Sequence, residues 1–409
     1  MTVPTCRFCG AALTRTFVDL GETPLANSYR DPADTRAEAR YPLHARVCDG
    51  CFLVQVDAAV PAEAIFSDYA YFSSYARSWV EHARRYAVAA RKRLGLGPDS
   101  LVIEVASNDG YLLQHFVAMG VPVLGIEPAA NVAAVAEQAG VPTRVAFFGR
   151  ALGAALADEG RQADLTAANN VLAHVPDLND FVAGFAAVLK PSGVATFEFP
   201  HLLRLIEGVQ FDTIYHEHFS YFSLLTVERV FAAHGLRVFD VEELPTHGGS
   251  LRLWVCHARA ALADTPSLAK VRADERAARL DRPEGYEGFA ARVAVVRDGL
   301  RAFLARAREA GQSVAAYGAA AKGNTLLNVC GVRPGDIMWV ADANPHKQGH
   351  LLPGSGIPVV APDRLRQDRP DRVLILPWNL KREIAADHAY IRDWGGRFVV
   401  AVPVVEEVT

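Results

Sequence analysis

Residues 101–128 read LVIEVASNDGYLLQHFVAMGVPVLGIEP, and this stretch decides the fold. An apolar strand is expected over 101–105, followed by the turn SNDG, a helix to about Met119 and a second strand over 121–128. Two apolar runs on either side of a helix are typical of a βαβ unit with parallel strands. The stretch therefore predicts a doubly wound α/β fold.

Further apolar runs continue this alternation toward the C-terminus. Strands are expected over residues 143–147, 163–168, 194–200, 236–241 and 250–255. A helix is expected over 177–189, followed by a turn at Pro191, Ser192 and Gly193. Together these elements would complete a seven-stranded Rossmann-like sheet that ends near Cys256.

A second series of the same kind follows. Apolar residues recur at three- and four-residue spacing from Phe289 to Leu304, which predicts a bridging helix. A strand and a helix are then expected over 313–328, and further strands over 337–345, 357–362, 372–379 and 397–405. This pattern predicts a second Rossmann-like α/β domain.

Composition limits the class of protein. The chain has 409 residues, of which 51% are hydrophobic and 22% charged, the balance of globular domains and not of fibrous or disordered chains. A formal charge of −4 gives no general basic field for nucleic acid or an anionic membrane. No apolar run approaches the roughly 18 residues of a membrane span, and the N-terminal MTVPTCRFCG lacks a secretory signal pattern. We therefore expect a cytoplasmic protein. We also expect a monomer, because no sustained heptad is present.

Four of the six cysteines form two tight pairs near the N-terminus, Cys6 with Cys9 and Cys48 with Cys51. The CxxC…CxxC spacing predicts a structural zinc ion, because each knuckle can direct two thiolates at one tetrahedral metal. A redox pair is less consistent with the positions, and His44 is an alternative fourth ligand. We therefore expect a zinc-binding module at 1–68, the seven-stranded domain at 69–258 and the second Rossmann-like domain at 259–409.

The loop after the first strand of the middle domain has the composition of a ligand site. Its small and polar residues allow a ligand to approach the carboxyl end of the sheet, although a GxGxxG fingerprint is absent. Glu127 ends the second strand, 17 residues after Gly110, where a carboxylate can accept both hydroxyls of a ribose. The spacing alone fits any adenosine compound, and a generic turn with a chance carboxylate is the alternative.

Residues 198–223, EFPHLLRLIEGVQFDTIYHEHFSYFS, are rich in groups that move protons. Tyr215, His216, Glu217 and His218 are consecutive, and the absence of HExxH argues against a two-histidine zinc face. A general base is the favoured interpretation, and a solvated polar loop is the alternative. His174 follows the fourth strand, at the ligand end of such a sheet, where a structural histidine would serve equally well.

Two further turns could hold an anion. Residues 318–323, GAAAKG, follow an apolar strand and open a helix, so backbone N–H groups and Lys322 could bind phosphate. The turn at 247–250 lies beside Arg252, whose guanidinium suits phosphate. Plain turns remain the alternative at both places.

Six motifs follow one another in a familiar order: CxxC…CxxC, VIEVASNDGYLL, ANNVLAHVPDL, EFPHLL…FDTIYHEHFSYFS, HGGSLR and YGAAAKGNTLLN. Together they resemble the S-adenosylmethionine-dependent nucleotide-sugar C-methyltransferases of deoxysugar biosynthesis, over essentially the whole chain. The resemblance implies methyl transfer to C-3 of a TDP-linked 4-keto-deoxysugar. The cofactor would bind the middle domain, and the sugar nucleotide would bind a cleft shared with the C-terminal domain.

The resemblance also implies roles for individual residues. The cofactor site is assigned to Glu104, Ala106, Ser107, Asn108, Asp109, Gly110, Glu127, Pro128, Asn169 and Asn170. The substrate site is assigned to His247, Ser250, Arg252, Lys322 and Asn324. His218 would remove the C-3 proton and Glu217 would fix its tautomer. Tyr215, His174 and a tyrosine of the DYAYFSSY segment, Tyr69 in preference to Tyr71, would surround the sugar and donate to the C-4 enolate.

Three other functions compete with this interpretation. An O- or N-methyltransferase of a sugar or other small metabolite needs the same cofactor site but no carbon acid. An NAD-dependent dehydrogenase or a ligand-sensing regulator would use the C-terminal domain, but GAAAKG lacks the dinucleotide spacing and Asp342 is its only acidic candidate. A zinc-ribbon nucleic-acid binder would need basic patches interleaved with aromatic residues, which the sequence lacks.

Overall fold

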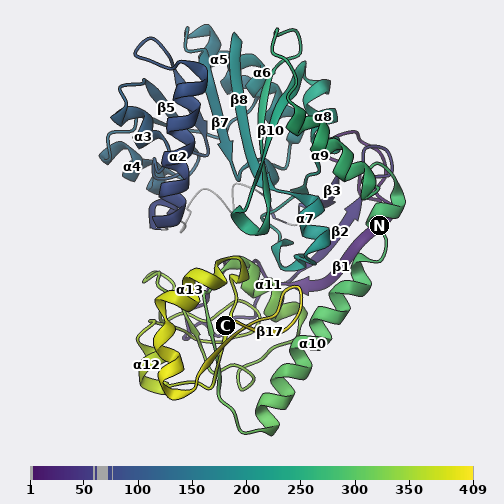
Figure 1. Cartoon of the computed structure of the whole chain (residues 1–409), viewed down its shortest axis with the longest axis vertical. Coiled ribbons are helices and arrows are strands. Elements are labelled where there is room, and N and C mark those ends of the chain that lie inside the picture. The colour runs from purple at the N-terminus through teal and green to yellow at the C-terminus, as the bar shows by residue number, and fades with distance from the viewer. Residues whose placement is uncertain (1–2, 59, 62–71, 76, 409) are drawn as a thin grey trace.

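A computed structural model describes residues 3–58, 60–61, 72–75 and 77–408, and its strands form three sheets (Figure 1). The N-terminal module contributes β1 (Arg15–Thr23), β2 (Tyr41–Val47) and β3 (Val54–Val56). Its fourth strand, β9 (Ser220–Tyr221), comes from the middle of the chain and pairs antiparallel with β3. The module is therefore joined to the segment that follows His218.

The second sheet has the seven strands that the sequence predicts, in the order β10-β11-β8-β7-β4-β5-β6. Their bounds are β4 (Val102–Val105), β5 (Val123–Glu127), β6 (Thr143–Val145), β7 (Ala163–Asn169), β8 (Leu189–Pro200), β10 (Leu236–Leu244) and β11 (Ser250–His257). All neighbours are parallel except β11, which is antiparallel to both β8 and β10. From β4 the chain first adds β5 and β6 on one side and then crosses to add β7 and β8 on the other side. Doubly wound sheets bind ligands in the crevice at such a switch point, which here lies between β4 and β7.

One local prediction about this sheet is wrong. Pro191, Ser192 and Gly193 lie within β8 instead of forming a turn. Between the pairs Ala163↔Leu189 and Leu165↔Val194 the register shifts, so that β8 carries extra residues opposite β7. Such an irregularity tolerates proline, because the bulged residues need not donate to the ladder.

Two helices of this domain, α3 (Leu113–Ala118) and α6 (Leu178–Val188), lie where the sequence predicts them. Among the described residues, six others accompany the sheet: α2 (Arg77–Leu94), α4 (Ala130–Gln138), α5 (Arg150–Asp158), α7 (Leu202–Glu207), α8 (Leu224–Ala233) and α9 (Pro266–Ala277). Short 3-10 helices are η1 (Ser73–Tyr75), η2 (Leu172–His174), η3 (Phe211–Thr213), η4 (Thr246–Gly248), η5 (Pro283–Tyr286), η6 (Trp378–Leu380) and η7 (Ala389–Trp394). None of the helices in the described part of the chain is long and apolar enough to cross a bilayer.

The third sheet confirms the second Rossmann-like domain. Its order is β14-β13-β12-β15-β16-β17, parallel except for the final strand. The strands are β12 (Val314–Tyr317), β13 (Val340–Ala341), β14 (Val359–Val360), β15 (Arg372–Ile375), β16 (Arg397–Val400) and β17 (Glu406–Val408). The helices are α10 (Phe289–Glu309), α11 (Ala321–Val329), α12 (Arg364–Asp368) and α13 (Lys381–Asp387). The long α10 is the expected bridge and descends along one side of the molecule (Figure 1).

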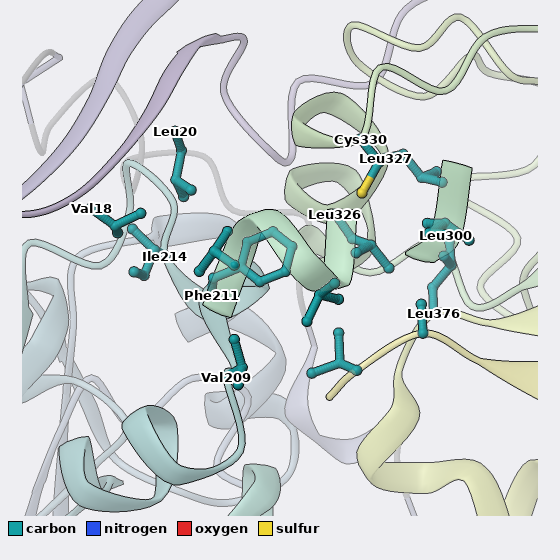
Figure 2. Close-up of a cluster of buried hydrophobic side chains, with 14 of the residues drawn as sticks. Val18, Leu20, Val209, Phe211, Ile214, Leu300, Leu326, Leu327, Cys330 and Leu376 are labelled. Carbon is teal, nitrogen blue, oxygen red and sulfur yellow. The ribbon is translucent and has the colours of Figure 1, made fainter. Parts of the chain in front are cut away.

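A single apolar cluster joins all three units around η3 (Figure 2). Its labelled members are Val18, Leu20, Val209, Phe211, Ile214, Leu300, Leu326, Leu327, Cys330 and Leu376, all of them buried. They come from β1, from the segment around η3, from α10 and α11, and from the end of β15. Because residues 209–214 lead directly into Tyr215 and His218, the candidate base is anchored in a core that no single unit provides.

Candidate active site

The four predicted cysteines form one cluster. Their sulfur atoms all lie within 4.8 Å of one another, and Cys6 Sγ is 3.6 Å from Cys51 Sγ. Four Zn–S bonds of about 2.3 Å in a tetrahedron place the sulfurs about 3.8 Å apart, so the cluster fits zinc. The alternative ligand His44 is wrong: its ring bonds Thr16 Oγ1 at 2.8 Å and faces the Arg46 guanidinium at 3.0 Å.

Glu127 lies at the carboxyl end of β5, beside the crevice of the sheet. Its Oε2 accepts a hydrogen bond from the Asn108 backbone N–H, and its Oε1 accepts one from the Ala129 N–H, both at 2.9 Å. Burial raises the pKa of this carboxyl, although both N–H groups oppose the shift. The carboxylate is thus held in one orientation with lone pairs left for the hydroxyls of a ribose.

The loop after β4 adopts the strained conformation that its small residues allow. Ala106, Asn108 and Gly110 have positive φ angles of 56°, 51° and 81°. A Cβ on Gly110 would lie 3.0 Å from a methyl carbon of Val141 and 3.3 Å from the Cβ of Ala136, so the loop packs closely on α4 and the turn that follows it. The Ser73 backbone N–H donates to Asn108 Oδ1 at 2.8 Å, which ties the lead-in to α2 onto this loop.

Buried acceptors at this edge suit a positively charged ligand. Asp109 Oδ1, Asn169 Oδ1 and Asn170 Oδ1 are buried, and no hydrogen-bond partner for them exists among the described residues. Buried acceptors without donors are costly, and an ammonium group would satisfy them. Glu104 lies beneath the loop, where burial raises the pKa of its carboxyl well above the usual range and the Tyr111 hydroxyl lowers it. These groups fit the methionine part of S-adenosylmethionine.

Aromatic side chains pack beside this loop, and one of them, Trp79, was not predicted from the sequence. Trp79 of α2 stacks on Tyr111 with ring centroids 5.9 Å apart, and its ring lies 5.4 Å from that of His247. The side chain of Asn170 bonds His247 Nε2 at 3.2 Å. The predicted residues His247 and Asn170 therefore meet at the end of the crevice where the cofactor is expected, which we call the cofactor end. An aromatic residue near the N-terminus of a helix was the only sequence signal for Trp79.

His218 is fixed in one tautomer. Its Nδ1 lies 2.9 Å from the Thr213 carbonyl oxygen, which can only accept, so Nδ1 carries the proton. Nε2 then accepts a hydrogen bond from the Tyr215 hydroxyl at 2.8 Å. Burial lowers the pKa of His218 well below its usual value, and the charge of a protonated His174 would lower it further. The ring is consequently a neutral base whose Nε2 lone pair points at Tyr215.

The prediction that Glu217 fixes this tautomer is wrong, because the Thr213 carbonyl does so. The His218 N–H donates to the Tyr215 carbonyl at 2.9 Å, and this turn brings the rings of Tyr215 and His218 to a centroid distance of 4.1 Å. Glu217 Oε1 accepts from Asn27 Nδ2 at 2.7 Å. Burial raises the pKa of Glu217 to about 7, against the effects of Asn27 and the Lys347 ammonium. Asn27 carried no motif and was missed.

His174 lies beside the base. Its ring centroid is 4.6 Å from that of His218, with the two rings nearly perpendicular at 77°. Burial lowers the pKa of His174 to about 4, so this ring is also neutral at neutral pH. His216, in contrast, bonds the Pro42 carbonyl at 3.2 Å and anchors the segment to the N-terminal module. Tyr69 and Tyr71 lie outside the described residues.

The C-terminal domain brings a lysine toward this centre. Lys322 Nζ donates to Asn379 Oδ1 at 2.7 Å and lies 4.6 Å from the centroid of the Trp378 ring. Its charge lowers the pKa of both His218 and His247, after the larger effect of burial. Lys322 is therefore a cation of the C-terminal domain whose charge acts on both His218 and His247.

Three other predicted substrate residues are engaged within the protein. Arg252 is 5% exposed, and its guanidinium pairs with Glu198 at 2.6 Å and Glu242 at 3.1 Å, so its assignment to phosphate is wrong. Ser250 Oγ donates to the Thr246 carbonyl at 2.9 Å and closes the turn at η4. Asn324 Nδ2 donates to the Ala26 carbonyl at 2.6 Å, joining α11 to the N-terminal module.

Known sequence families cover these regions. Residues 6–66 match "Putative zinc binding domain", residues 79–241 match "Methyltransferase domain", and residues 245–403 match "C-methyltransferase C-terminal domain". The C-methyltransferase NovU of Streptomyces niveus is 37% identical over 399 residues, which is 97% of this chain and 95% of NovU.

More distant likenesses cover only part of the chain. A ubiquinone biosynthesis O-methyltransferase of Rhodopseudomonas palustris (strain BisA53) is 29% identical over 113 residues, 26% of this chain and 45% of that protein. Among solved structures, the magnesium protoporphyrin IX methyltransferase of Synechocystis PCC 6803 with bound SAM is 15% identical, with a TM-score of 0.33. That match covers 44% of this chain and 77% of the other.

Proposed function

The chain belongs to the S-adenosylmethionine-dependent C-methyltransferases, and from this premise we propose that it methylates C-3 of a TDP-linked 4-keto-deoxysugar. It holds a structural zinc ion in its four-cysteine cluster. Transfer to carbon needs a proton to leave that carbon, and an adjacent ketone makes such a proton acidic. The observation that carries the proposal is the hydrogen-bonded pair of Tyr215 and His218, a neutral imidazole base beside a hydroxyl donor.

We assign the steps as follows. His218 Nε2 removes the C-3 proton, while the Thr213 carbonyl holds Nδ1–H and supports the imidazolium that forms. The Tyr215 hydroxyl, released from Nε2, donates to the C-4 enolate oxygen. His174 is left out of this role, because its neutral ring has one N–H and that N–H bonds the Glu217 backbone carbonyl. When bound, S-adenosylmethionine supplies the electrophilic methyl group that the carbanion takes. Glu127 and the loop after β4 would hold its adenosyl and methionine parts.

The sugar nucleotide is proposed to lie between the middle and C-terminal domains. The ammonium of Lys322 suits its diphosphate, since this charge reaches both His218 and His247 from the C-terminal side. Glu217 and Asn27 form a hydrogen-bonded pair next to the base in sequence, and a carboxyl with a pKa of about 7 can bind a sugar hydroxyl.

Solvent exchange tests the proposal directly. The protein with S-adenosylhomocysteine and a TDP-linked 4-keto-deoxysugar in deuterated water should place deuterium at C-3 without methyl transfer. The His218→Asn variant should lower this exchange by about 10²–10⁴-fold, which is the usual worth of a positioned base. His346→Asn, at an exposed position of the C-terminal domain, is the matched control. A parallel reaction with S-adenosylmethionine locates the transferred methyl group. Methyl transfer to oxygen or nitrogen there, with no C-3 exchange in the first assay, would identify an O- or N-methyltransferase and refute the proposal.

A further inference from the structure

Trp378 reaches from η6 of the C-terminal domain into the middle domain. Its Nε1 donates to Asp212 Oδ2 at 2.7 Å, and Asp212 belongs to η3. The Asp212 side chain is fully buried, with an exposed fraction of 0%, and burial raises its pKa to about 6. The charge of Lys322 and the indole N–H of Trp378, both from the C-terminal domain, oppose this shift, so the buried carboxyl is sensitive to how the domains meet.

The same indole contacts a second turn of the middle domain. Gly248 in η4 has a φ of +94°, and a Cβ placed there would lie 2.4 Å from Trp378 Cη2. The ring therefore occupies the space that any larger side chain at this position would need. Gln210 Nε2 donates to the Gly248 carbonyl at 2.8 Å, which ties the approach to η3 directly to η4.

Asp212 and Gly248 are each adjacent in sequence to a residue of the candidate site or its support. Asp212 precedes Thr213, whose carbonyl fixes the tautomer of His218. Gly248 follows His247, which bonds Asn170 at the cofactor end. A single side chain of the C-terminal domain thus contacts the supports of both histidines, one at the base and one beside the cofactor loop.

We propose that Trp378 is a positioning residue, through which the C-terminal domain sets the orientation of the His218 ring and the position of the His247 ring. The inference rests on the proposed function for its effect on turnover, but its effect on the His218 ring does not depend on the substrate. Contact with the C-terminal domain would then hold His218 in its single Nδ1–H tautomer. Without that contact, the middle domain would leave His218 in a mixture of tautomers.

The test compares two indole substitutions of the same kind. Trp378→Phe keeps the ring and removes the N–H that Asp212 accepts. Trp339→Phe is the matched control, because Trp339 Nε1 donates to Asp368 Oδ2 at 2.9 Å entirely within the C-terminal domain. Nitrogen-15 NMR of histidine-labelled full-length protein with S-adenosylhomocysteine reports the tautomer of each ring, and His218→Asn identifies the His218 signals.

Wild type and Trp339→Phe should show His218 as the single Nδ1–H tautomer. Trp378→Phe should show both tautomers, with unchanged affinity for S-adenosylhomocysteine and a turnover lowered about 10- to 100-fold, the effect of losing one hydrogen bond to a buried carboxylate. Since KM should change little, the loss would fall in kcat.

The outcomes separate this inference from the proposed function. A single Nδ1–H tautomer in Trp378→Phe, with the turnover of Trp339→Phe, would overturn the inference even if the keto-sugar is methylated. Mixed tautomers in Trp378→Phe would support it even if the wild type rejects TDP-linked sugars. If Trp378→Phe unfolds, Gly248→Ala probes the same contact from the other side and should also mix the tautomers, whereas native tautomers there would count against the inference.

Discussion

Removing zinc should loosen the segment that carries the base. Cys48→Ser deletes one of four thiolates, and structural zinc sites contribute about 10–16 kcal/mol in zinc-finger peptides. This exceeds or equals the whole stability of about 5–15 kcal/mol of an ordinary domain, so the four-stranded sheet should lose its order. The sheet includes β9, because Val54 pairs with Tyr221 and the Val56 N–H donates to the Phe219 carbonyl at 3.1 Å. The loss should therefore reach the chain immediately after His218.

A second connection makes the same expectation stronger. The buried Gln55 donates through Nε2 to Cys6 Sγ at 3.2 Å, and its Oε1 accepts from the Arg7 backbone N–H at 2.9 Å. Its own backbone pairs with Ser220 of β9. Gln55 thus connects a predicted zinc ligand, Cys6, to β9, the strand that follows His218.

Hydrogen exchange measured by mass spectrometry is the assay, with zinc content determined on the same samples. In Cys48→Ser, amides of residues 219–221 should exchange as fast as those of β3, while amides of β5 keep their protection and S-adenosylhomocysteine still binds. Cys256→Ser, a buried cysteine of β11 outside the cluster, should keep both zinc and protection. A zinc-free Cys48→Ser protein with native protection at β9 and normal turnover would refute the reasoning.

Three other perturbations probe separate parts of the chain. Glu127→Ala should weaken S-adenosylhomocysteine binding by about 1.5–3 kcal/mol in calorimetry, the worth of hydrogen bonds to a charged group, and unchanged affinity would exclude a ribose contact. Phe211→Ala should lower the unfolding free energy by about 3–5 kcal/mol in urea titration, because the ring is fully buried where three units meet, and a smaller loss would mean that the cluster rearranges. The folded pKa of Glu217, about 7, is raised above its unfolded value of 4.5, so stability should fall as pH rises between these values, by about 3 kcal/mol in total. Glu217→Gln should lack this slope, and a wild type with the same pH dependence would contradict the assignment.

Much of the fold could be predicted from sequence, since long apolar runs and glycine turns carry local signals. The seven-stranded sheet, the second Rossmann-like domain and the cysteine cluster follow from such patterns and are confirmed. The insertion of Pro191 into β8 could not, because it depends on the register with β7. Neither could the pairing of β9 with β3, since a two-residue strand has no periodicity. The unit boundaries at 68 and 258 stay predictions.

The candidate site shows the same division. Glu127 was predictable because its place at the end of a strand is a local feature. The orientation of Glu217 was not, because neighbours in sequence point apart at a turn whose geometry the residue types do not reveal. Arg252 looked suited to phosphate until its two carboxylate partners, distant in sequence, were placed beside it. Residue types identify chemistry, whereas the partners that orient or occupy them come from tertiary contacts.

If His218 is the base, the arrangement gives the two additional units a role in holding it. The chain between β8 and β10 leaves the seven-stranded sheet, and His218, the proposed base, lies in this segment, so the sheet alone does not hold it. Its support comes from β3 through β9, from α11 through the apolar cluster around Phe211, and from Trp378 through Asp212. A carbon acid is deprotonated efficiently only if the base is already oriented and shielded from water, since reorganisation during the step adds to the barrier. In the proposed mechanism the zinc module and the C-terminal domain would supply that preorganisation, and loss of either should lower proton abstraction more than cofactor binding.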